Sequence, residues 1–214
     1  MDFELIRRGA EAPDLAGLNA LPNVAADLSA AFGADPMFDW FSRIDERRDA
    51  ARERFFRFVL RHVVYRVGEI ERPGPGAAAA VWMPSEALGP APLLRELQAL
   101  PALIGLTGWP RFGRLAAMRE AMDRHHPIDR PHDYLFFLGV VPEAQGHGIG
   151  SRLLKARTDR LDALNRPAFL ETATQANVRL YSRHGFRVLT EFRPRPDAPL
   201  NWTMWREPKS PADL

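Results

Sequence analysis

A buried strand followed by a glycine-rich turn and a helix constrains this chain more than any other feature. The nearly continuous apolar run Tyr134–Val141 is bounded by Pro142 and predicts a strand buried on both faces. Alternating glycines follow, and a helix is expected over about Ile149–Leu164. Glycine lets the backbone curve tightly and approach a ligand closely, and the free N–H groups that begin the helix suit a phosphate or pyrophosphate. The glycines are Gly146, Gly148 and Gly150.

Several readings of this turn compete. A P-loop needs Gly-Lys-Ser/Thr, which is absent. A dinucleotide fingerprint would need glycine at Ser151, although Glu171 ends a strand about 20 residues further on, where a ribose-binding acid is expected. The unit also starts too late in the chain to leave room for a second mononucleotide-binding half. A glycine-rich turn without a ligand remains an alternative.

Composition narrows the class of protein. A length of 214 residues predicts one domain over 1–214. The absence of cysteine excludes disulfides, thiolate zinc sites and a cysteine nucleophile. A net charge of +2 without a basic run predicts no nucleic-acid partner. Neither a secretory signal nor a long apolar segment is evident, so we expect a cytoplasmic location and no membrane partner.

The remaining pattern alternates between helices and strands, which indicates an α/β protein with a mixed sheet. Between two of the strands, an irregular insertion at about 85–129 carries helical patches and many bends, and we expect it to fold over the acceptor side with Leu93, Leu94, Leu97 and Leu100. The expected strands are Phe3–Arg7, Tyr65–Glu71, Ala77–Met83, Ala168–Glu171, Phe186–Phe192 and Leu200–Arg206, and the expected helices are Asp14–Phe32 (interrupted near Pro22 and stopped by Gly33), Glu46–Val64, Leu93–Leu106, Phe112–Met122 and Gln175–His184.

Two segments carry a resemblance to a known family. Gln145–Gly150, in the pattern QxxGxG, resembles motif A of the GNAT superfamily of N-acetyltransferases, and Leu138–Pro142 resembles its cofactor-side strand. Asn177–Phe186 resembles an N-x-x-x-Y-x-x-x-G-F segment found in part of that family. The resemblance is specific over about 134–192. Looser matches to the puromycin-acetyltransferase-like branch are Asp35–Phe38, Ala80–Pro84 and Pro131–Leu135.

The resemblance implies an α/β (α+β) GNAT fold, with a splayed mixed sheet of about seven strands flanked by helices. Acetyl-CoA would lie in the V between the fourth and fifth strands, Tyr134–Val141 and Ala168–Glu171. The implied enzyme is an acetyl-CoA-dependent N-acetyltransferase, in which a primary amine of a small molecule attacks the thioester directly. A non-catalytic acyl-CoA sensor or interaction protein is the alternative. The acceptor stays open, as does the choice between monomer and homodimer.

The resemblance also assigns roles in cofactor binding. Main-chain groups of Leu138, Gly139 and Val140 would pair with the pantetheine arm, and backbone N–H groups of the glycine turn would hold the pyrophosphate. His147 either touches a phosphate or is a solvated loop residue. The full cofactor-binding set is Leu138, Gly139, Val140, Val141, Gln145, Gly146, His147, Gly148, Ile149, Gly150, Ser151, Asn177 and Tyr181.

Two residues are candidates for catalysis. By resemblance Tyr181 would be the general acid that protonates the departing thiolate, which a phenol with a pKa near 10 can do; packing of its helix is the alternative. Some family members carry a glutamate as base where Tyr134 stands here, so Glu171 is the substitute we expect, acting through water. Glu171 as a structural carboxylate, an amine that arrives neutral, and a water chain also remain open.

Two further groups of residues have an alternative interpretation in which they bind no ligand. His125, His126, Asp129, His132 and Asp133 resemble a metal cluster, but their spacing fits no defined site, so we expect the rim of an acceptor pocket and no metal. Five large apolar side chains could line that pocket or belong to the core: Met37, Phe38, Trp40, Trp82 and Trp109.

Overall fold

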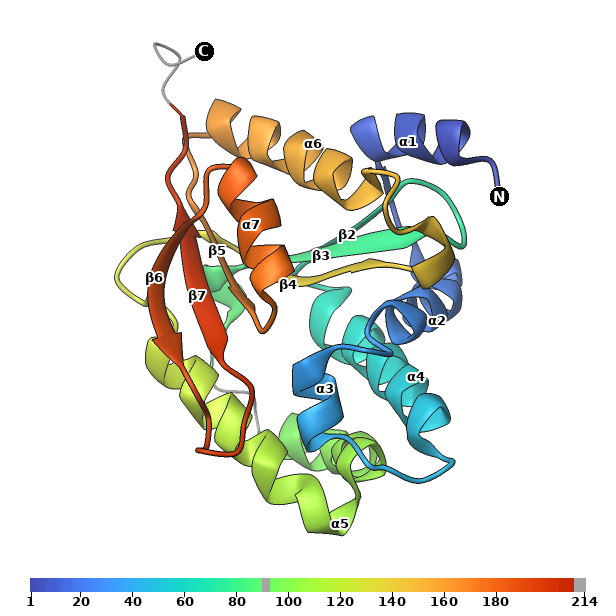
Figure 1. Cartoon of the computed structure of the whole chain (residues 1–214), viewed down its shortest axis with the longest axis vertical. Helices are drawn as coiled ribbons and strands as arrows, with labels where there is room; N and C mark the ends of the chain where they lie inside the picture. Colours follow the sequence, from blue (N-terminus) through green and yellow to red (C-terminus); the bar gives the residue numbers. More distant parts are fainter. Residues whose placement is uncertain (90–92, 210–214) are drawn as a thin grey trace.

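A seven-stranded sheet forms the centre of the protein (Figure 1). The computed structural model describes residues 1–89 and 93–209, with side chains described outside 93–96. The strand order is β1-β2-β3-β4-β5-β7-β6, and every neighbouring pair is antiparallel except β4 and β5. The expected mixed sheet is confirmed. The strands are β1 (Asp14–Leu15), β2 (Glu69–Arg72), β3 (Ala78–Pro84), β4 (Asp133–Val140), β5 (Ala168–Thr172), β6 (Arg187–Phe192) and β7 (Asn201–Arg206).

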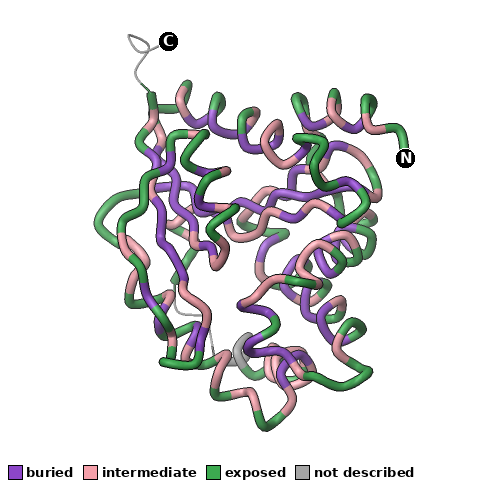
Figure 2. The backbone as a smooth tube through the Cα atoms, in the orientation of Figure 1, coloured by how far each residue is buried: buried purple, intermediate pink, exposed green. Residues whose placement is uncertain are grey.

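Helices cover both faces of the sheet and leave the central strands buried (Figure 2). One apolar cluster joins α1, α6 and α7 to the sheet, and a second joins α2, α3, α4 and α5 to its other face. The helices are α1 (Phe3–Glu11), α2 (Leu21–Ala31), α3 (Pro36–Phe41), α4 (Arg48–Val59, continued by a π-helical turn over Leu60–Val64), α5 (Leu93–His125), α6 (Ile149–Ala163) and α7 (Gln175–Arg183).

The sheet opens where β4 and β5 part (Figure 1). Their parallel register runs only from Asp133↔Ala168 to Leu135↔Leu170. The rest of β4 keeps its register with β3 alone, and β5 turns away to pair with β7. A bulge at Phe136 lies at the point of divergence, because Leu135 faces Trp82 while Phe137 faces Val81. The two strands therefore form the V that the sequence predicted.

The first element is a helix, so the strand predicted over Phe3–Arg7 is wrong. Asp2 caps the helix by accepting from the N–H groups of Glu4 and Leu5, both at 3.1 Å. Ile6 and Ala10, four residues apart, are buried against α6. The apparent alternation misled because Leu5, which fits it, is 68% exposed.

The predicted helix Asp14–Phe32 is only partly right. Its first residues form β1, the edge strand that pairs with β2, and a short 3-10 turn follows. Pro22 lies in the first turn of α2 instead of interrupting it, a position where proline loses no hydrogen bond. The helix ends just before Gly33, whose N–H bonds to Ala30 O at 3.1 Å.

The segment between β3 and β4 is largely helical. Helix α5 contains a sharp kink at Gly108, with φ 64° and ψ 163°, between Pro101 and Pro110. The predicted helical patches and bends are therefore confirmed, although the helices are longer than expected. The expected contributions of Leu93 and Leu94 lie outside the described side chains.

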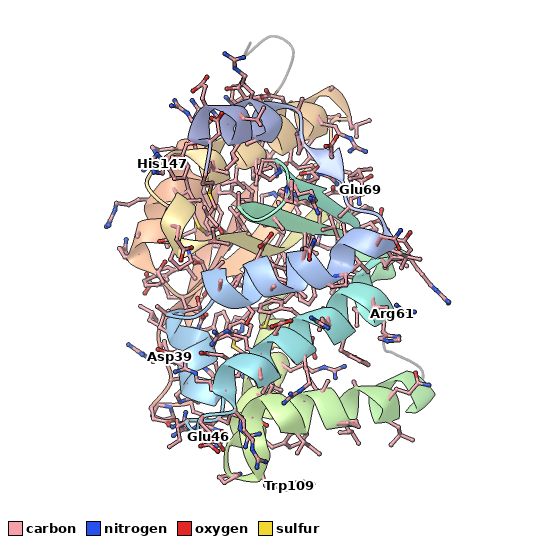
Figure 3. The ribbon with its side chains drawn as sticks, turned by 90° about the vertical axis from the view of Figure 1, so that its right-hand side faces the viewer. Asp39, Glu46, Arg61, Glu69, Trp109 and His147 are labelled. Atoms are coloured by element: carbon pink, nitrogen blue, oxygen red, sulfur yellow. The ribbon has the colours of Figure 1, made fainter. Side chains whose placement is uncertain are left out.

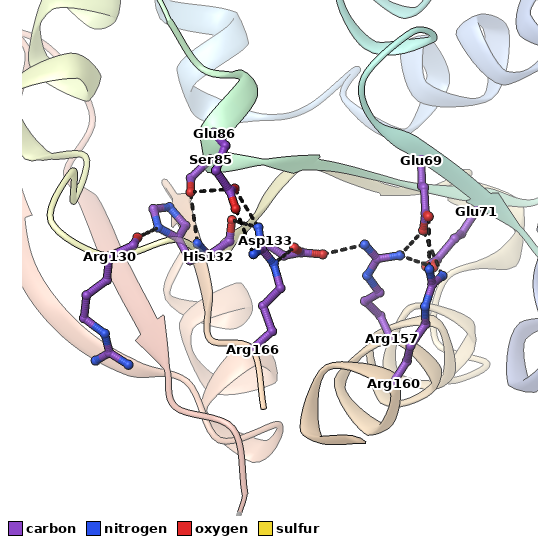
Figure 4. Close-up of polar contacts among 10 residues, drawn as sticks. All are labelled: Glu69, Glu71, Ser85, Glu86, Arg130, His132, Asp133, Arg157, Arg160 and Arg166. Atoms are coloured by element: carbon purple, nitrogen blue, oxygen red, sulfur yellow. Dashed lines mark hydrogen bonds and ion pairs between the residues drawn. The ribbon is translucent and has the colours of Figure 1, made fainter. Parts of the chain in front are cut away.

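Helix α6 is tied to the sheet by a buried charge network (Figure 4). Arg157 is enclosed on three sides by Glu69, Glu71 and Asp133, which come from β2 and β4. Its guanidinium also lies 5.3 Å from the ring centre of Trp82. These contacts hold α6, and hence the turn at its start, in a fixed position on the sheet.

Within the part of the chain that the structure describes, no helix is both long and apolar enough to cross a membrane.

Candidate active site

The glycine turn places a free helix start at the open end of β4. Gly146 and Gly148 have φ of 80° and 73°, a region that favours glycine. Gly148 is the N-cap of α6, and no side chain among the described residues caps that helix. A Cβ on Gly150 would lie 3.3 Å from Val140 Cγ2, so this glycine lets α6 approach β4 closely. The uncapped N–H groups can therefore bind an anion at this point.

The predicted pantetheine strand is present, with two qualifications. Gln145 donates from Nε2 to Val140 O at 3.0 Å, and the N–H of Val141 donates to Ala77 O at 2.9 Å, so these two groups already have partners. A Cβ on Gly139 would lie only 2.8 Å from the Cβ of Ala31. Gly139 is thus needed for α2 to pack on β4, a requirement separate from any ligand.

Three other predicted cofactor residues are anchored by side-chain contacts. The ring of His147 stacks on Phe3 of α1 with centroids 3.8 Å apart, and Figure 3 shows it beside that helix. Ile149 is buried under the turn. Ser151 Oγ lies 2.7 Å from His184 Nε2, and burial, together with nearby arginines, lowers the pKa of His184. These contacts fix the shape of the turn.

Tyr181 lies on α7 with its ring in the core and its hydroxyl unbonded. The residue is 6% exposed, its ring packs edge-on against Phe186 at 5.9 Å, and the hydroxyl has no hydrogen bond to any described residue. Burial, and then the charge of Asp35, raises the pKa of Tyr181. The phenol is therefore kept protonated. Asn177, one turn earlier, is half-buried, and its N–H is capped by Thr174 Oγ1 at 3.2 Å.

From the sequence, Asp35 was only the first residue of a loose puromycin-acetyltransferase-like match, with no role of its own. It is the N-cap of α3 and accepts from the N–H groups of Met37 and Phe38, both at 2.9 Å. Its negative charge helps to raise the pKa of Tyr181, so the carboxylate lies near that phenol. An Asp-Pro pair that opens a helix is a capping signal, so the position was readable from the sequence, whereas its approach to Tyr181 was not.

Glu171 lies where β5 leaves β4, directly after the last paired residue, Leu170. Its side chain is 5% exposed, and Oε1 is buried without a hydrogen-bond partner in the described part of the chain. Burial, and then the negative charge of Glu171, raises the pKa of Tyr134. Glu171, the expected base, therefore lies near Tyr134, which occupies the position of the glutamate found in some family members. His126 Nδ1 is 3.9 Å from Oε1.

The five residues of the metal-like cluster separate in space. Asp133 binds Arg157 and Arg166, and Asp129 is exposed. His125 contacts Ala121 O at 2.7 Å, while His126 and His132 face each other. Among the described residues, no three His, Asp or Glu side chains converge as metal ligands.

The five large apolar side chains also divide. Three of them are core residues of α3: Met37, Phe38 and Trp40. Trp82 is fully buried on the opposite face of the sheet, and Trp109 is 75% exposed at the far end of the molecule from His147 (Figure 3). The depression beside Trp109 has a volume of about 560 Å³ and is lined by residues of 43–45 and 101–111, so it is separate from Tyr181 and Glu171. Trp109 therefore does not line the candidate site, and Trp82 has no exposed surface with which to contact a ligand.

Comparisons with known proteins agree with this geometry. A model of the acetyltransferase (GNAT) domain matches residues 113–188, from the second half of α5 to the start of β6. Among solved structures, histone acetyltransferase HPA2 and related acetyltransferase from Corynebacterium glutamicum is 24% identical, with a TM-score of 0.68 over 93% of this chain and 98% of that chain.

Two insect enzymes have the same architecture. Polyamine N-acetyltransferase from Drosophila melanogaster is 16% identical, with a TM-score of 0.56 over 91% of this chain and 98% of that chain. Arylalkylamine N-acetyltransferase 2 from Aedes aegypti is 12% identical, with a TM-score of 0.58 over 92% and 98%. These likenesses establish the GNAT fold, and the expected fold class is confirmed.

Proposed function

We propose that this protein is an N-acetyltransferase that moves the acetyl group of acetyl-CoA to a primary amine of a small molecule by direct attack. The observation that carries the proposal is the V between β4 and β5, with an uncapped, glycine-lined helix start at its mouth. Glu171 lies where β5 leaves β4, and Tyr181 lies on α7, the helix that follows β5. An anion site, an open strand edge and two ionisable groups are the parts that acetyl transfer from a CoA thioester needs.

The residues present fit acetyl-CoA, which would supply the acetyl group as a reactive thioester. The N–H groups from Gln145 to Ser151 would hold the pyrophosphate, because positive φ at Gly146 and Gly148 leaves the backbone open to an anion. The part of β4 without a partner on the β5 side, Phe136–Val140, offers main-chain groups to the pantetheine amides. The absence of cysteine favours direct attack over a cysteinyl acyl-enzyme.

Tyr181 is the group we assign to protonate the departing sulfur. Its unbonded hydroxyl is free to donate, and its raised pKa keeps the proton in place until a thiolate forms. Glu171 is assigned to the amine side, where its buried carboxylate can accept a proton. Asn177 would contact the cofactor from the same helix face as Tyr181.

The test is acetyl transfer across a panel of amines. We would follow thiol release and identify the product by mass, with agmatine and polyamines in the panel because structures of this fold carry those activities in their names. Aminonucleoside antibiotics belong in it because of the looser puromycin-acetyltransferase-like segments, and amino-acid derivatives and peptide N-termini complete it. Amine-dependent thiol release with matching N-acetyl product is expected. Tight acetyl-CoA binding without transfer to any amine would favour the sensor alternative.

A further inference from the structure

Two histidines lie behind Glu171, on the face of the sheet that α5 covers. His126 follows the last turn of α5, and its N–H donates to Met122 O at 2.9 Å. His132 precedes β4 and is fully buried. The Nε2 atoms of the two rings are 3.1 Å apart, a hydrogen-bond distance at which one ring donates and the other accepts.

The backbone determines which ring donates. His132 Nδ1 is 2.8 Å from Arg130 O, and a carbonyl oxygen only accepts, so this nitrogen carries a proton. Burial lowers the pKa of His132 and keeps its ring neutral. The lone pair of His132 is therefore on Nε2, and His126 donates to it from its own Nε2.

The remaining nitrogen of His126 faces a carboxylate. In neutral His126 the lone pair is then on Nδ1, which lies 3.9 Å from Glu171 Oε1. That oxygen is the buried acceptor without a partner among the described residues. Two acceptors thus face each other with no proton between them, about 1 Å beyond hydrogen-bond distance. Catalytic contacts are often this long before the substrate binds.

We propose that Glu171 and His126 form a dyad that accepts a proton from the amine, and that His132 is a positioning residue that fixes His126 as an acceptor. The proposal rests on the function proposed above and deepens it. It assigns the acceptor class, an alkyl amine that arrives as an ammonium ion and must lose a proton before it can attack.

The proton balance is complete. The amine nitrogen gives up one proton to the dyad, between Nδ1 of His126 and Oε1 of Glu171, and its freed electron pair forms the C–N bond. The C–S bond then breaks, and the sulfur takes a proton from Tyr181. The second proton lost by nitrogen restores the phenol, and the dyad releases its own proton to water.

Charged groups on the neighbouring elements are compatible with this role. On β4, burial and the charge of Glu171 raise the pKa of the buried Tyr134, so its phenol stays neutral. Asp123 on α5 adds negative charge near it. On the far side of the second ring, Arg166 and Glu86 act with opposite signs. Asp123 is therefore the acid outside the dyad that adds negative charge on this side.

The first test does not depend on activity. Long-range proton–nitrogen NMR spectra of the full chain, labelled with ¹⁵N-histidine, report the tautomer of each ring at a pH where histidines are neutral. We expect the Nε2–H form for His126 and the Nδ1–H form for His132. Signals would be assigned with His126→Gln and His132→Gln. An Nδ1–H tautomer at His126 would overturn the proposal.

The second test is a pH profile of kcat/KM with an alkyl amine that the wild type acetylates. His126→Gln should lower kcat/KM by roughly 10²–10³-fold near pH 7. The loss should shrink as the pH approaches the pKa of the amine, because the amine then arrives neutral. Acetyl-CoA affinity and Tm should be unchanged. A loss that is equal at every pH, or no loss, would refute the dyad, as would activity that a chelator removes and zinc restores.

The third test separates positioning from packing. His132→Gln can keep an acceptor for His126, whereas His132→Leu cannot. We expect the Gln variant to retain roughly ten-fold more activity at pH 7 than the Leu variant, with the difference disappearing at high pH. Equal losses would contradict the positioning role. If the wild type acetylates no amine at all, the proposed function fails, while the NMR result still decides the hydrogen-bond arrangement.

Discussion

Replacement of Tyr181 by phenylalanine separates a chemical role from a structural one. The ring is 6% exposed and packs on Phe186, and Tyr181→Phe keeps both features. The hydroxyl has no hydrogen bond to any described residue, so its removal breaks none of the bonds that the structure records. A hydrogen-bonded hydroxyl contributes about 1 kcal/mol to stability, and the change here should be smaller. We therefore expect Tm to stay close to that of the wild type.

The effect on turnover should be much larger. General-acid catalysis contributes about 10²–10⁴-fold, which corresponds to about 2.7–5.4 kcal/mol of activation free energy. Water can reach a departing thiolate and soften the loss toward the lower value. The Kd for acetyl-CoA should change little, because the cofactor contacts we assign are mainly backbone groups of β4 and the glycine turn.

The assay is thiol release followed with a disulfide reagent, which the protein itself does not consume because it has no cysteine. Tyr65 is exposed and provides the matched control, so Tyr65→Phe should behave as wild type. Unchanged kcat in Tyr181→Phe, measured where chemistry limits the rate, would reduce Tyr181 to a packing residue. A fall in Tm or in acetyl-CoA affinity would instead show that its hydroxyl is structural.

Three further predictions test other parts of the structure. Gly148→Glu and Gly148→Gln strain the same positive-φ position equally and differ in charge, so calorimetry should show that the Glu variant binds acetyl-CoA about 10–100-fold more weakly than the Gln variant. Equal affinities of the two variants would remove the pyrophosphate assignment. Burial alone would raise the pKa of Asp162, but two hydrogen bonds from Arg206, both at 2.7 Å, lower it below the ordinary value of 3.8. Asp162→Asn should therefore cost about 3–5 kcal/mol of unfolding free energy at pH 7 in denaturant titrations, and this difference should be lost as the pH falls below 3.8. Arg157→Gln should cost about as much unfolding free energy, because it leaves buried carboxylates without their cation, whereas Glu71→Gln should cost far less, since burial raises the pKa of Glu71 and its Oε2 has no partner among the described residues. Equal losses of the two variants in urea unfolding would contradict this account of the network.

The C-terminal half was largely predictable because local signals there agree with the tertiary structure. The apolar run of β4, the glycine turn and Gly185 after α7 each fix a boundary without help from distant residues. The N-terminal half was harder. Residues 3–7 alternate by chance, and only the cap at Asp2 and burial against α6 make them helical.

The candidate site also has a part that was predictable from the sequence and a part that was not. Most of the residues that we assign to the cofactor lie within Leu138–Ser151, so a motif locates them. The acid, the base and their neighbours come from four separate segments, and their proximity depends on where the chain crosses. Nothing local to His126 or Asp35 indicates that one reaches Glu171 and the other lies near Tyr181. The divergence of β4 from β5, which brings these groups to one opening, is a property of the whole sheet.

The two ends of the segment that carries α5, Ser85 and His132, are hydrogen-bonded to each other. The N–H of Ser85 donates to His132 O at 2.8 Å, and the N–H of His132 donates to Ser85 Oγ at 2.9 Å. The segment is therefore a long connection between two paired strands, β3 and β4. The entropic cost of closing such a connection grows by only about 0.6 kcal/mol for each doubling of its length. A connection of this kind can become longer or shorter, or be exchanged, without disturbing the sheet. Because the segment carries His126 and ends at His132, an exchange would replace the residues of the proposed dyad and leave the glycine turn and α6 unchanged.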